Sequence, residues 1–285
     1  MKAMIVGAGG QLGQALAATA PEGWKLLCCD RQSLDITDAE KTRAQVLAVS
    51  PDLLLNAGAY TAVDRAESEE RAAFAINALA VRTLADAARA AGSQFVHVST
   101  DFVFDGRSST PYAPDSPPNP LGVYGRSKLE GERLAGPDAL IVRTAWVYGR
   151  NGGNFVRTML RLMTERPEIR VVADQIGTPT YVPSLARAIW ILAMKKARGL
   201  YHYSDAGVAS WYDFAVAIQE EACTIGLLKS AIPILPIATE DYPTPARRPA
   251  FSVLDKRSTL ALTGLTAVHW RENLRSFLKD LKDNG

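Results

Sequence analysis

The sequence predicts an α/β protein with a doubly wound parallel sheet of the Rossmann type and a smaller C-terminal lobe. Three observations predict it: apolar runs that alternate with helical patterns, a glycine-rich turn directly after the first run, and a change to proline-rich loops in the last third.

Five short apolar runs are predicted to form strands, at residues 3–6, 24–29, 53–56, 95–99 and 140–143. Between them, Ala, Leu, Arg and Glu at helical spacing predict helices over residues 12–19, 39–49, 72–91 and 125–134. Strands of this kind form a parallel sheet with both faces covered by helices. Residues 1–150 are therefore predicted to form a dinucleotide-binding domain.

The rest of the chain is predicted to complete the sheet and then form a separate lobe. Strand-like runs at residues 170–173 and 199–203, with a helix over 184–196 between them, are expected to extend the sheet. From residue 204 prolines interrupt the chain, and helices are predicted only over 211–222 and 271–281. Residues 204–285, with parts of 151–180, are expected to bind substrate over the carboxyl ends of the strands.

The composition excludes several classes of protein. The 285 residues carry a formal net charge of +2, from 32 basic and 30 acidic residues, which argues against nucleic-acid binding. The three cysteines lack metal or disulfide spacing. No apolar run approaches the ~20 residues of a membrane span, and the first residues lack a signal-peptide pattern. We expect a cytoplasmic protein with no membrane partner.

The first motif with chemical meaning is a glycine-rich turn, in which Gly7, Gly10 and Gly13 follow an apolar strand and open a helix. Glycines at this spacing permit a tight turn and bring a pyrophosphate close to backbone N–H groups at the helix N-terminus. An ordinary glycine turn is the alternative, but the order of strand, glycines and helix favours dinucleotide binding.

Two charged residues at the end of the second strand concern the choice of cofactor. Asp30 is placed to accept hydrogen bonds from the adenosine ribose of NAD, whereas Arg31 could face the 2′-phosphate of NADP. The alternative is a solvated charged turn. The pair leaves the choice open, so we expect both NADPH and NADH to be used.

A Tyr-x-x-x-Lys pair, Tyr124 and Lys128, lies at the start of a predicted helix. A spacing of four puts both side chains on one face of that helix. A phenol has an ordinary pKa near ~10, and a nearby ammonium is expected to favour the phenolate and lower that pKa. Alone this pattern is common by chance and typical of a half-exposed surface.

A hydroxyl residue upstream strengthens the prediction of a catalytic site. Thr100 ends an apolar strand, at the edge of the sheet where ligands bind. Its hydroxyl can bind a substrate carbonyl and stabilise the charge that develops on the oxygen. A strand-end cap is the alternative, and the presence of the Tyr/Lys pair favours the catalytic interpretation.

With these motifs the chain resembles the extended short-chain dehydrogenase/reductases, and within them the dTDP-4-dehydrorhamnose reductases. The resemblance spans essentially the whole chain through GAGGQLG, NAGAYTAVDRAE, VSTDFVFDG, YGRSKLEGE, RTAWVYG, DQIGTPT and YPTPARRP. It implies NAD(P)H-dependent reduction of the C4 keto group of dTDP-4-dehydro-L-rhamnose to dTDP-L-rhamnose. Thr100 and Tyr124 would bind and protonate the keto oxygen, and Lys128 would hold the nicotinamide ribose and the tyrosine.

The same resemblance implies further binding residues. It places Trp146 beside the sugar and Asp30 at the adenosine ribose, and it puts two segments along the cofactor: Gly10, Gln11, Leu12 and Ala57, Gly58, Ala59. From its position alone, Trp146 is a buried strand-end aromatic that could form an apolar wall against a 6-deoxy methyl group.

The nucleotide diphosphate of the implied substrate needs cations from the C-terminal lobe. Arg247 and Arg248 in the YPTPARRP loop are the candidates for the nucleotide diphosphate, because the planar guanidinium suits phosphate oxygens. Solvated surface charge is the alternative for such a pair.

Two differences from related families narrow the prediction. Sugar-nucleotide 4,6-dehydratases carry an Asp-Glu pair after the threonine, whereas here Asp101 precedes Phe102, which cannot abstract a proton. Asp101 could still bind a sugar hydroxyl. Some reductases of the family form Mg²⁺-bridged dimers through an acidic residue after the last glycine of the turn. Gln14 follows Gly13 here, so we expect no metal, and a monomer or homodimer.

Two other functions remain open from the sequence. A regulatory subunit of methionine adenosyltransferase resembles the same reductase and would bind NADP without turning over a keto-sugar. A sugar-nucleotide epimerase would retain NAD through purification and regenerate it in each cycle.

Overall fold

The structure, a computed structural model, describes residues 1–284 and is built on a six-stranded parallel sheet. The strands stand in the order β10 (Gly199–His202), β5 (Leu140–Thr144), β4 (Gln94–Thr100), β3 (Leu53–Asn56), β1 (Lys2–Val6) and β2 (Lys25–Cys29). Strands are added on one side of β1 and then on the other, and ligands of doubly wound sheets bind at such a reversal. The predicted fold class is confirmed.

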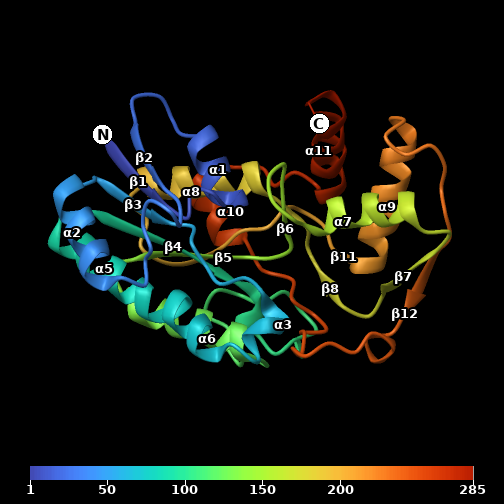
Figure 1. Cartoon of the computed structure of the whole chain (residues 1–285), viewed down its shortest axis with the longest axis horizontal. Helices are drawn as coiled ribbons and strands as arrows, with labels where there is room; N and C mark the ends of the chain where they lie inside the picture. The colour runs from blue at the N-terminus through green and yellow to red at the C-terminus, as the bar shows by residue number, and fades with distance from the viewer. Residues whose placement is uncertain (285) are drawn as a thin grey trace.

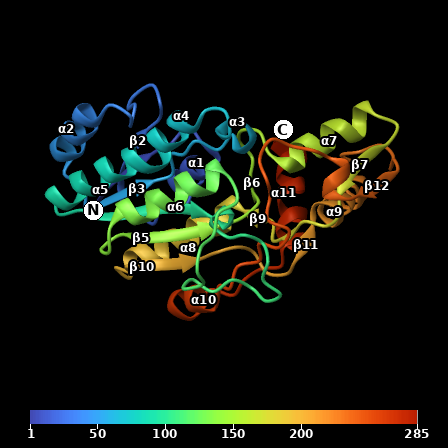
Figure 2. The ribbon, with the colours of Figure 1, turned by 90° about the horizontal axis from the view of Figure 1, so that it is seen from below.

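Helices cover both faces of this sheet (Figures 1 and 2). One face packs on α1 (Gln11–Ala18) and α8 (Val182–Met194), with α10 (Arg257–Thr263) beside α8, and the other on α2 (Ala39–Val49), α5 (Ala80–Ala90) and α6 (Val123–Ala135). Ile5 and Leu55 face the first layer, and Met4 and Leu54 face the second. Every residue of β3 is buried, as expected of a strand covered on both faces.

The helix predicted over residues 72–91 is interrupted. It consists of α4 (Glu70–Phe74), a π-helical turn over Ala75–Leu79, and α5. The π turn presents Asn77, whose side chain accepts a hydrogen bond from the Tyr60 N–H (2.8 Å) and donates one to Ser127 Oγ (3.0 Å). The carbonyl of Asn77 approaches Gly131 of α6 so closely that a Cβ would clash. This contact sets the height of α6 above the sheet.

A second core lies beside the sheet domain, to the right in Figure 1. It packs α7 (Phe155–Glu165), α9 (Trp211–Thr224) and α11 (Trp270–Asn284) around a two-stranded sheet of β7 (Ile169–Val172) and β12 (Ile234–Ile237). Of the two runs expected to extend the main sheet, β10 does so and β7 does not. β7 follows α7, whose buried face belongs to the second core, so Ile169 and Val171 are buried there too. Neither α7, α10 nor β12 was predicted from the sequence.

Four short strands connect the two parts of the molecule: β6 (Val147–Tyr148), β8 (Ile176–Gly177), β9 (Thr180–Tyr181) and β11 (Ala209–Ser210). The short helix α3 (Val63–Ala66) packs on α4 and α6 of the sheet domain. β6 pairs with β9, and β8 with β11. Among residues 1–284, no helix is long and apolar enough to cross a membrane.

Replacing Gly131 by Ala tests the contact between α6 and the π turn. The added methyl group would meet the Asn77 carbonyl oxygen, and overpacking of this kind costs about 1–3 kcal/mol. Urea unfolding should show a loss of that size. Gly153→Ala is the matched control, because no heavy atom lies within 4 Å of the added carbon. Equal stability of the two variants would contradict the close approach.

Candidate active site

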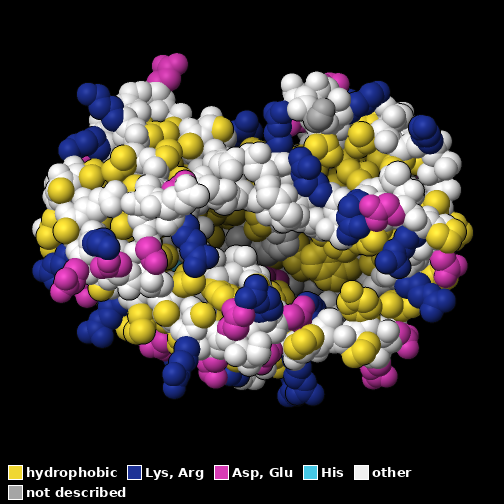
Figure 3. Space-filling view, in the orientation of Figure 1, with side chains coloured by type: hydrophobic (Ala, Val, Ile, Leu, Met, Phe, Trp, Pro, Cys, Tyr) yellow, Lys and Arg dark blue, Asp and Glu magenta, His cyan; other side chains and the backbone are white. Residues whose placement is uncertain are grey.

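A cavity of about 700 Å³ lies at the carboxyl ends of the sheet strands. Its walls come from the segments that follow β1, β2, β3, β4 and β5 and from the first turns of α1 and α6. Figure 3 shows the molecule hollowed between its two parts, with hydrophobic side chains inside the hollow. The strand reversal beside β1 therefore coincides with the cavity.

The glycine turn forms one wall of the cavity. Gly7 adopts a φ of +75°, and a Cβ there would lie 2.5 Å from the backbone nitrogen of Gly58. Gly13 is buried against the carbonyl of Gly7, which allows α1 to pack closely on β1. Gly10 is the N-cap of α1 and offers no capping side chain, so the first-turn N–H groups are left for an anion. Gly10, Gln11 and Leu12 line the cavity, whereas Gly13 supports them from behind.

The loop after β2 places Asp30 and Arg31 in the cavity wall. Asp30 Oδ1 accepts hydrogen bonds from the N–H groups of Gln32 (3.0 Å) and Ser33 (2.9 Å) and from Ser33 Oγ (2.8 Å). These donors hold the pKa of Asp30 below its ordinary value. Asp30 is thus an ionised carboxylate that also fixes its own loop.

The segment after β3 supplies Ala57, Gly58 and Ala59, all of which line the cavity. Asn56 at the end of β3 accepts a hydrogen bond from the Gly58 N–H (3.1 Å) and contacts His97 Nδ1 through its Nδ2 (3.2 Å). A buried polar pair on two neighbouring strands therefore holds this segment against the glycine turn.

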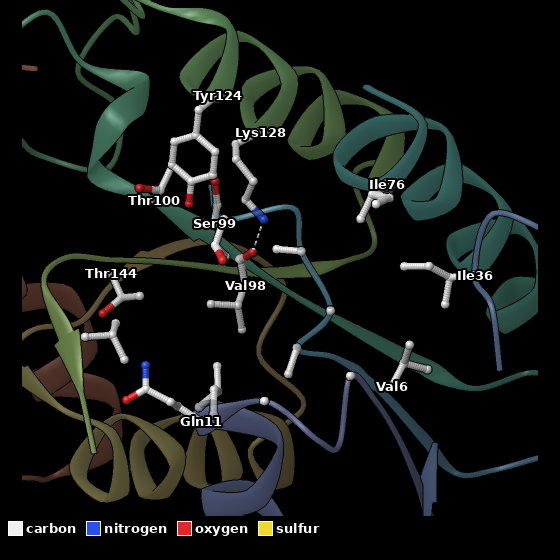
Figure 4. A pocket seen from close by; sticks show the side chains of 18 of the residues that line it. Val6, Gln11, Ile36, Ile76, Val98, Ser99, Thr100, Tyr124, Lys128 and Thr144 are labelled. Atoms are coloured by element: carbon white, nitrogen blue, oxygen red, sulfur yellow. Dashed lines mark hydrogen bonds between the residues drawn. The ribbon is translucent and has the colours of Figure 1, made fainter. Parts of the chain in front are cut away.

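The predicted catalytic residues converge in the cavity, as Figure 4 shows. Thr100 ends β4, and its Oγ1 donates a hydrogen bond to Asp101 Oδ1 (3.0 Å). Tyr124 and Lys128 come from the first two turns of α6. Lys128 is 2% exposed, and its Nζ donates to the carbonyl of Val98 (2.6 Å). The lysine is therefore anchored to β4, beside the strand end that carries Thr100.

The electrostatics of the pair differ from the expectation that Lys128 lowers the pKa of the tyrosine. Burial raises the pKa of Tyr124 to about 12, opposed by a hydrogen bond from Thr100 and reinforced by the charge of Asp101. Burial also lowers the pKa of Lys128 to about 8. Desolvation is the largest cause of the shift in the pKa of Tyr124, and the ammonium of Lys128 is directed to the Val98 carbonyl. At neutral pH the tyrosine is a neutral phenol.

Three buried oxygens in the cavity wall have no hydrogen-bond partner within the described chain: Ser99 Oγ, Asp101 Oδ2 and Thr144 Oγ1. Buried polar atoms are usually satisfied, so unpaired ones beside a cavity indicate a ligand. Ser99 and Thr144 were not predicted, although Thr144 ends β5 and the strand-end rule could have found it. Ile36, Thr37 and Ile76 also line the cavity and had no signal in the sequence.

Trp146 forms the wall toward the second core, and it is half-buried where the sequence predicted a buried side chain. Its backbone has a φ of +48°, an uncommon conformation for an aromatic residue. The indole stacks on Trp211 with ring centroids 3.5 Å apart and planes 6° apart. A Cβ at Gly177 would lie 2.6 Å from the Trp146 ring. Close packing against Trp211 and Gly177 therefore holds the strained conformation.

The arginine pair lies away from the cavity wall. Arg248 donates to both carboxylate oxygens of Asp64 (2.8 and 3.1 Å), and Arg247 is exposed. Neither residue is among those that line the cavity. Their binding to phosphate stays a prediction. It requires Arg248 to break its ion pair with Asp64, or to bind the phosphate and Asp64 together.

Fold and site together define a Rossmann-type protein with the dinucleotide cradle and Tyr/Lys pair of the extended short-chain dehydrogenase/reductases. The sequence profile of the family described as "RmlD substrate binding domain" matches residues 1–283. The chain belongs to this family.

Individual relatives agree with that assignment. Spore coat polysaccharide biosynthesis protein SpsK of Bacillus subtilis is 41% identical over 283 residues, covering 98% of this chain and 97% of the relative. The dTDP-4-dehydrorhamnose reductase of Aggregatibacter actinomycetemcomitans is 41% identical over 284 residues, covering 96% and 97%. The crystal structure of dTDP-4-dehydrorhamnose reductase from Bacillus anthracis in complex with NADP is similar with a TM-score of 0.92, at 38% identity, covering 98% and 99%.

Asp101 makes the stability of the fold depend on pH in an unusual direction. Burial raises the pKa of Asp101 from 3.8 to about 6, so the folded chain holds this proton more tightly than the unfolded chain. The stabilisation is complete below the unfolded value and is lost as the pH rises through about 6. Asp101→Asn should therefore be more stable than the wild type at pH 8, by about 1–3 kcal/mol.

The measurement is urea unfolding at an acidic pH, close to the unfolded pKa, and at pH 8. The exposed Asp115→Asn serves as control and should change stability little at either pH. A stability difference for Asp101→Asn that is the same at both pH values would contradict the assigned pKa.

Proposed function

We propose that this chain is a dTDP-4-dehydrorhamnose reductase, which uses NADPH or NADH to reduce the C4 keto group of dTDP-4-dehydro-L-rhamnose to dTDP-L-rhamnose. The observation that carries the proposal is the meeting of Thr100, Tyr124 and Lys128 in the same cavity as the glycine cradle. Relatives with this name at about 40% identity support it, as does the NADP complex of the Bacillus anthracis reductase.

The cavity wall fits a dinucleotide. A Cβ at Gly7 would fill the approach to Gly58, and the N-terminus of α1 leaves N–H groups for a pyrophosphate. Asp30 would accept hydrogen bonds from the adenosine ribose, and Lys128 would hold the nicotinamide ribose. When bound, the reduced nicotinamide supplies the hydride that reduces the carbonyl carbon.

The protein supplies a proton and stabilises developing charge. The hydroxyl of Thr100 would turn from Asp101 Oδ1 to donate its hydrogen bond to the keto oxygen. Tyr124 would donate its phenolic proton to the nascent alkoxide. The raised pKa of Tyr124 suits proton donation by the tyrosine, because the acid must be protonated when the alkoxide forms. Phe102 packs edge-on against the tyrosine ring, with centroids 5.5 Å apart, and keeps the phenol aimed into the cavity.

The substrate would lie between the catalytic residues and the aromatic wall. Trp146 offers an apolar face to the 6-methyl group, and the unpaired Oδ2 of Asp101 would accept a hydrogen bond from a sugar hydroxyl. Arg247 and Arg248 would bind the diphosphate. With this assignment, residues 1–150 bind the cofactor, and residues 204–285 with parts of 151–180 bind the substrate, in a cytoplasmic monomer or homodimer that uses no metal.

Tyr124→Phe should lower the rate of NADPH oxidation with dTDP-4-dehydro-L-rhamnose by about 10²–10⁴-fold, because it removes the general acid. NADPH affinity, measured by fluorescence titration, should stay close to that of the wild type. Tyr60→Phe is the matched control, since that phenol bonds to Glu69.

The same experiment separates the alternatives. A wild-type protein that binds NADP but never oxidises NADPH with the keto-sugar would indicate the regulatory subunit. NAD retained through purification, with no net oxidation, would indicate the epimerase.

Lys128 predicts an alkaline limit to activity. Its pKa of about 8 means that the ammonium is present below that pH and lost above it, so kcat/KM for NADPH should fall as the pH rises through about 8. Lys128→Arg stays protonated across this range. The variant should be slower at pH 7 but show no such fall between pH 7 and 9. A shared alkaline limb in both proteins would assign it to another group.

A further inference from the structure

The loop from Gly149 to Asn154 contacts the side chain of Gln11 at the start of α1. Asn154 Nδ2 donates a hydrogen bond to Gln11 Oε1 (3.1 Å), and Gln11 Nε2 donates to the carbonyl of Gly153 (3.4 Å). A Cβ at Gly152 would lie 3.3 Å from Gln11 Cγ. In Figure 4 the Gln11 side chain lies on the same side of the cavity as Thr144.

Asn154 also fixes the start of α7. Its Oδ1 accepts a hydrogen bond from the Arg157 N–H (3.1 Å) as the N-cap of that helix, and its Nδ2 also donates to the Gly149 carbonyl (2.7 Å). A single amide therefore joins the N-terminus of α1, in the sheet domain, to the N-terminus of α7, in the second core.

The first residue of α7 belongs to the aromatic wall. Phe155 packs on Trp211 with ring centroids 4.6 Å apart, and Trp211 stacks on Trp146. Trp146 and Gln11 both line the cavity. A continuous series of contacts therefore begins at Gln11 and passes through Asn154 and Phe155. It continues through Trp211 to the indole of Trp146.

We propose that Asn154 is a positioning residue that couples cofactor binding to substrate binding. A pyrophosphate on the first turn of α1 restricts the conformations of the Gln11 side chain. The hydrogen bond from Asn154 to Gln11 then restricts the start of α7, and with it the position of the aromatic wall. By reciprocity, a sugar nucleotide against the wall tightens the cofactor by the same factor. The coupling rests on the proposed function, because it needs a dinucleotide and a sugar nucleotide in one cavity.

The test measures NADPH affinity by fluorescence titration with and without saturating dTDP-L-rhamnose. This product gives no turnover with reduced cofactor under the proposed function. The ratio of the two dissociation constants is the coupling factor, expected at about 5-fold or more in the wild type. Asn154→Ser keeps an N-cap side chain for α7 but cannot reach Gln11, so its factor should fall to about 2 or less.

Two matched variants separate coupling from damage to α7. Thr158 Oγ1 donates to the Asn154 carbonyl (2.9 Å), so Thr158→Ala disturbs the same first turn without touching Gln11, and its coupling factor should match the wild type. Asn154→Asp keeps the cap of α7 but replaces the amide nitrogen, which donates to Gln11 Oε1 and to the Gly149 carbonyl, by an oxygen that cannot donate. This variant should lose the coupling while α7 stays capped.

A second route avoids dependence on the folding of Asn154→Ser. Gln11→Met removes the same hydrogen bond from the other partner, and it should lower the coupling factor to the same level even where NADPH affinity itself changes. The double variant should show no further loss, because both changes remove one interaction.

Several results would overturn the proposal: a wild-type coupling factor near one, a wild-type factor retained in both Asn154→Ser and Gln11→Met, or an equal loss in Thr158→Ala. Failure of the proposed function is distinguishable. In that case the wild type would neither oxidise NADPH with the keto-sugar nor bind dTDP-L-rhamnose. The proposed coupling would then be rejected together with the proposed function.

Discussion

The site depends on how closely backbone segments approach each other where the order of strand addition reverses. Gly7 turns with a positive φ directly against Gly58, and Gly13 packs on the carbonyl of Gly7, so that no Cβ fits at either contact. These approaches bring the ends of β1 and β3 and the start of α1 to one wall of the cavity. A side chain at Gly7 or Gly13 would push α1 outward, and the helix N-terminus would no longer face the position of an anion.

The predicted catalytic residues are positioned by a second constraint, the height of α6 above the sheet. The π turn presents Asn77 to this helix, and Gly131 admits its carbonyl, while Lys128 donates to Val98 on β4. These contacts bury Lys128 and desolvate Tyr124, which explains both pKa shifts. Burial keeps the phenol protonated, and a protonated phenol is the form that a reductase needs. Under the proposed function, the packing that stabilises the helix therefore also keeps the tyrosine in the form that can donate a proton.

Local patterns in the sequence predicted the parts of the structure that neighbouring residues determine. The alternation of apolar runs and helices predicted the sheet domain, and strand-end position with residue spacing predicted that Thr100, Tyr124 and Lys128 share one site. Features set by contacts between distant segments escaped prediction. β7 pairs with β12 because α7 enters the second core, and the backbone of Trp146 is held by Trp211 and Gly177. The pKa of Tyr124 also depends on burial, which spacing does not reveal.

Under the proposed function, the cavity holds NADPH so that its hydride reaches C4 of a keto-sugar while the protein provides the proton. The most direct measurement uses NADPH deuterated at C4 of the nicotinamide, in both diastereomers, with dTDP-4-dehydro-L-rhamnose, and follows the product by proton NMR. One diastereomer should give dTDP-L-rhamnose that lacks its H4 signal, because deuterium has moved to that carbon. Retention of the H4 signal with both diastereomers, or the absence of any reduced sugar, would contradict the account.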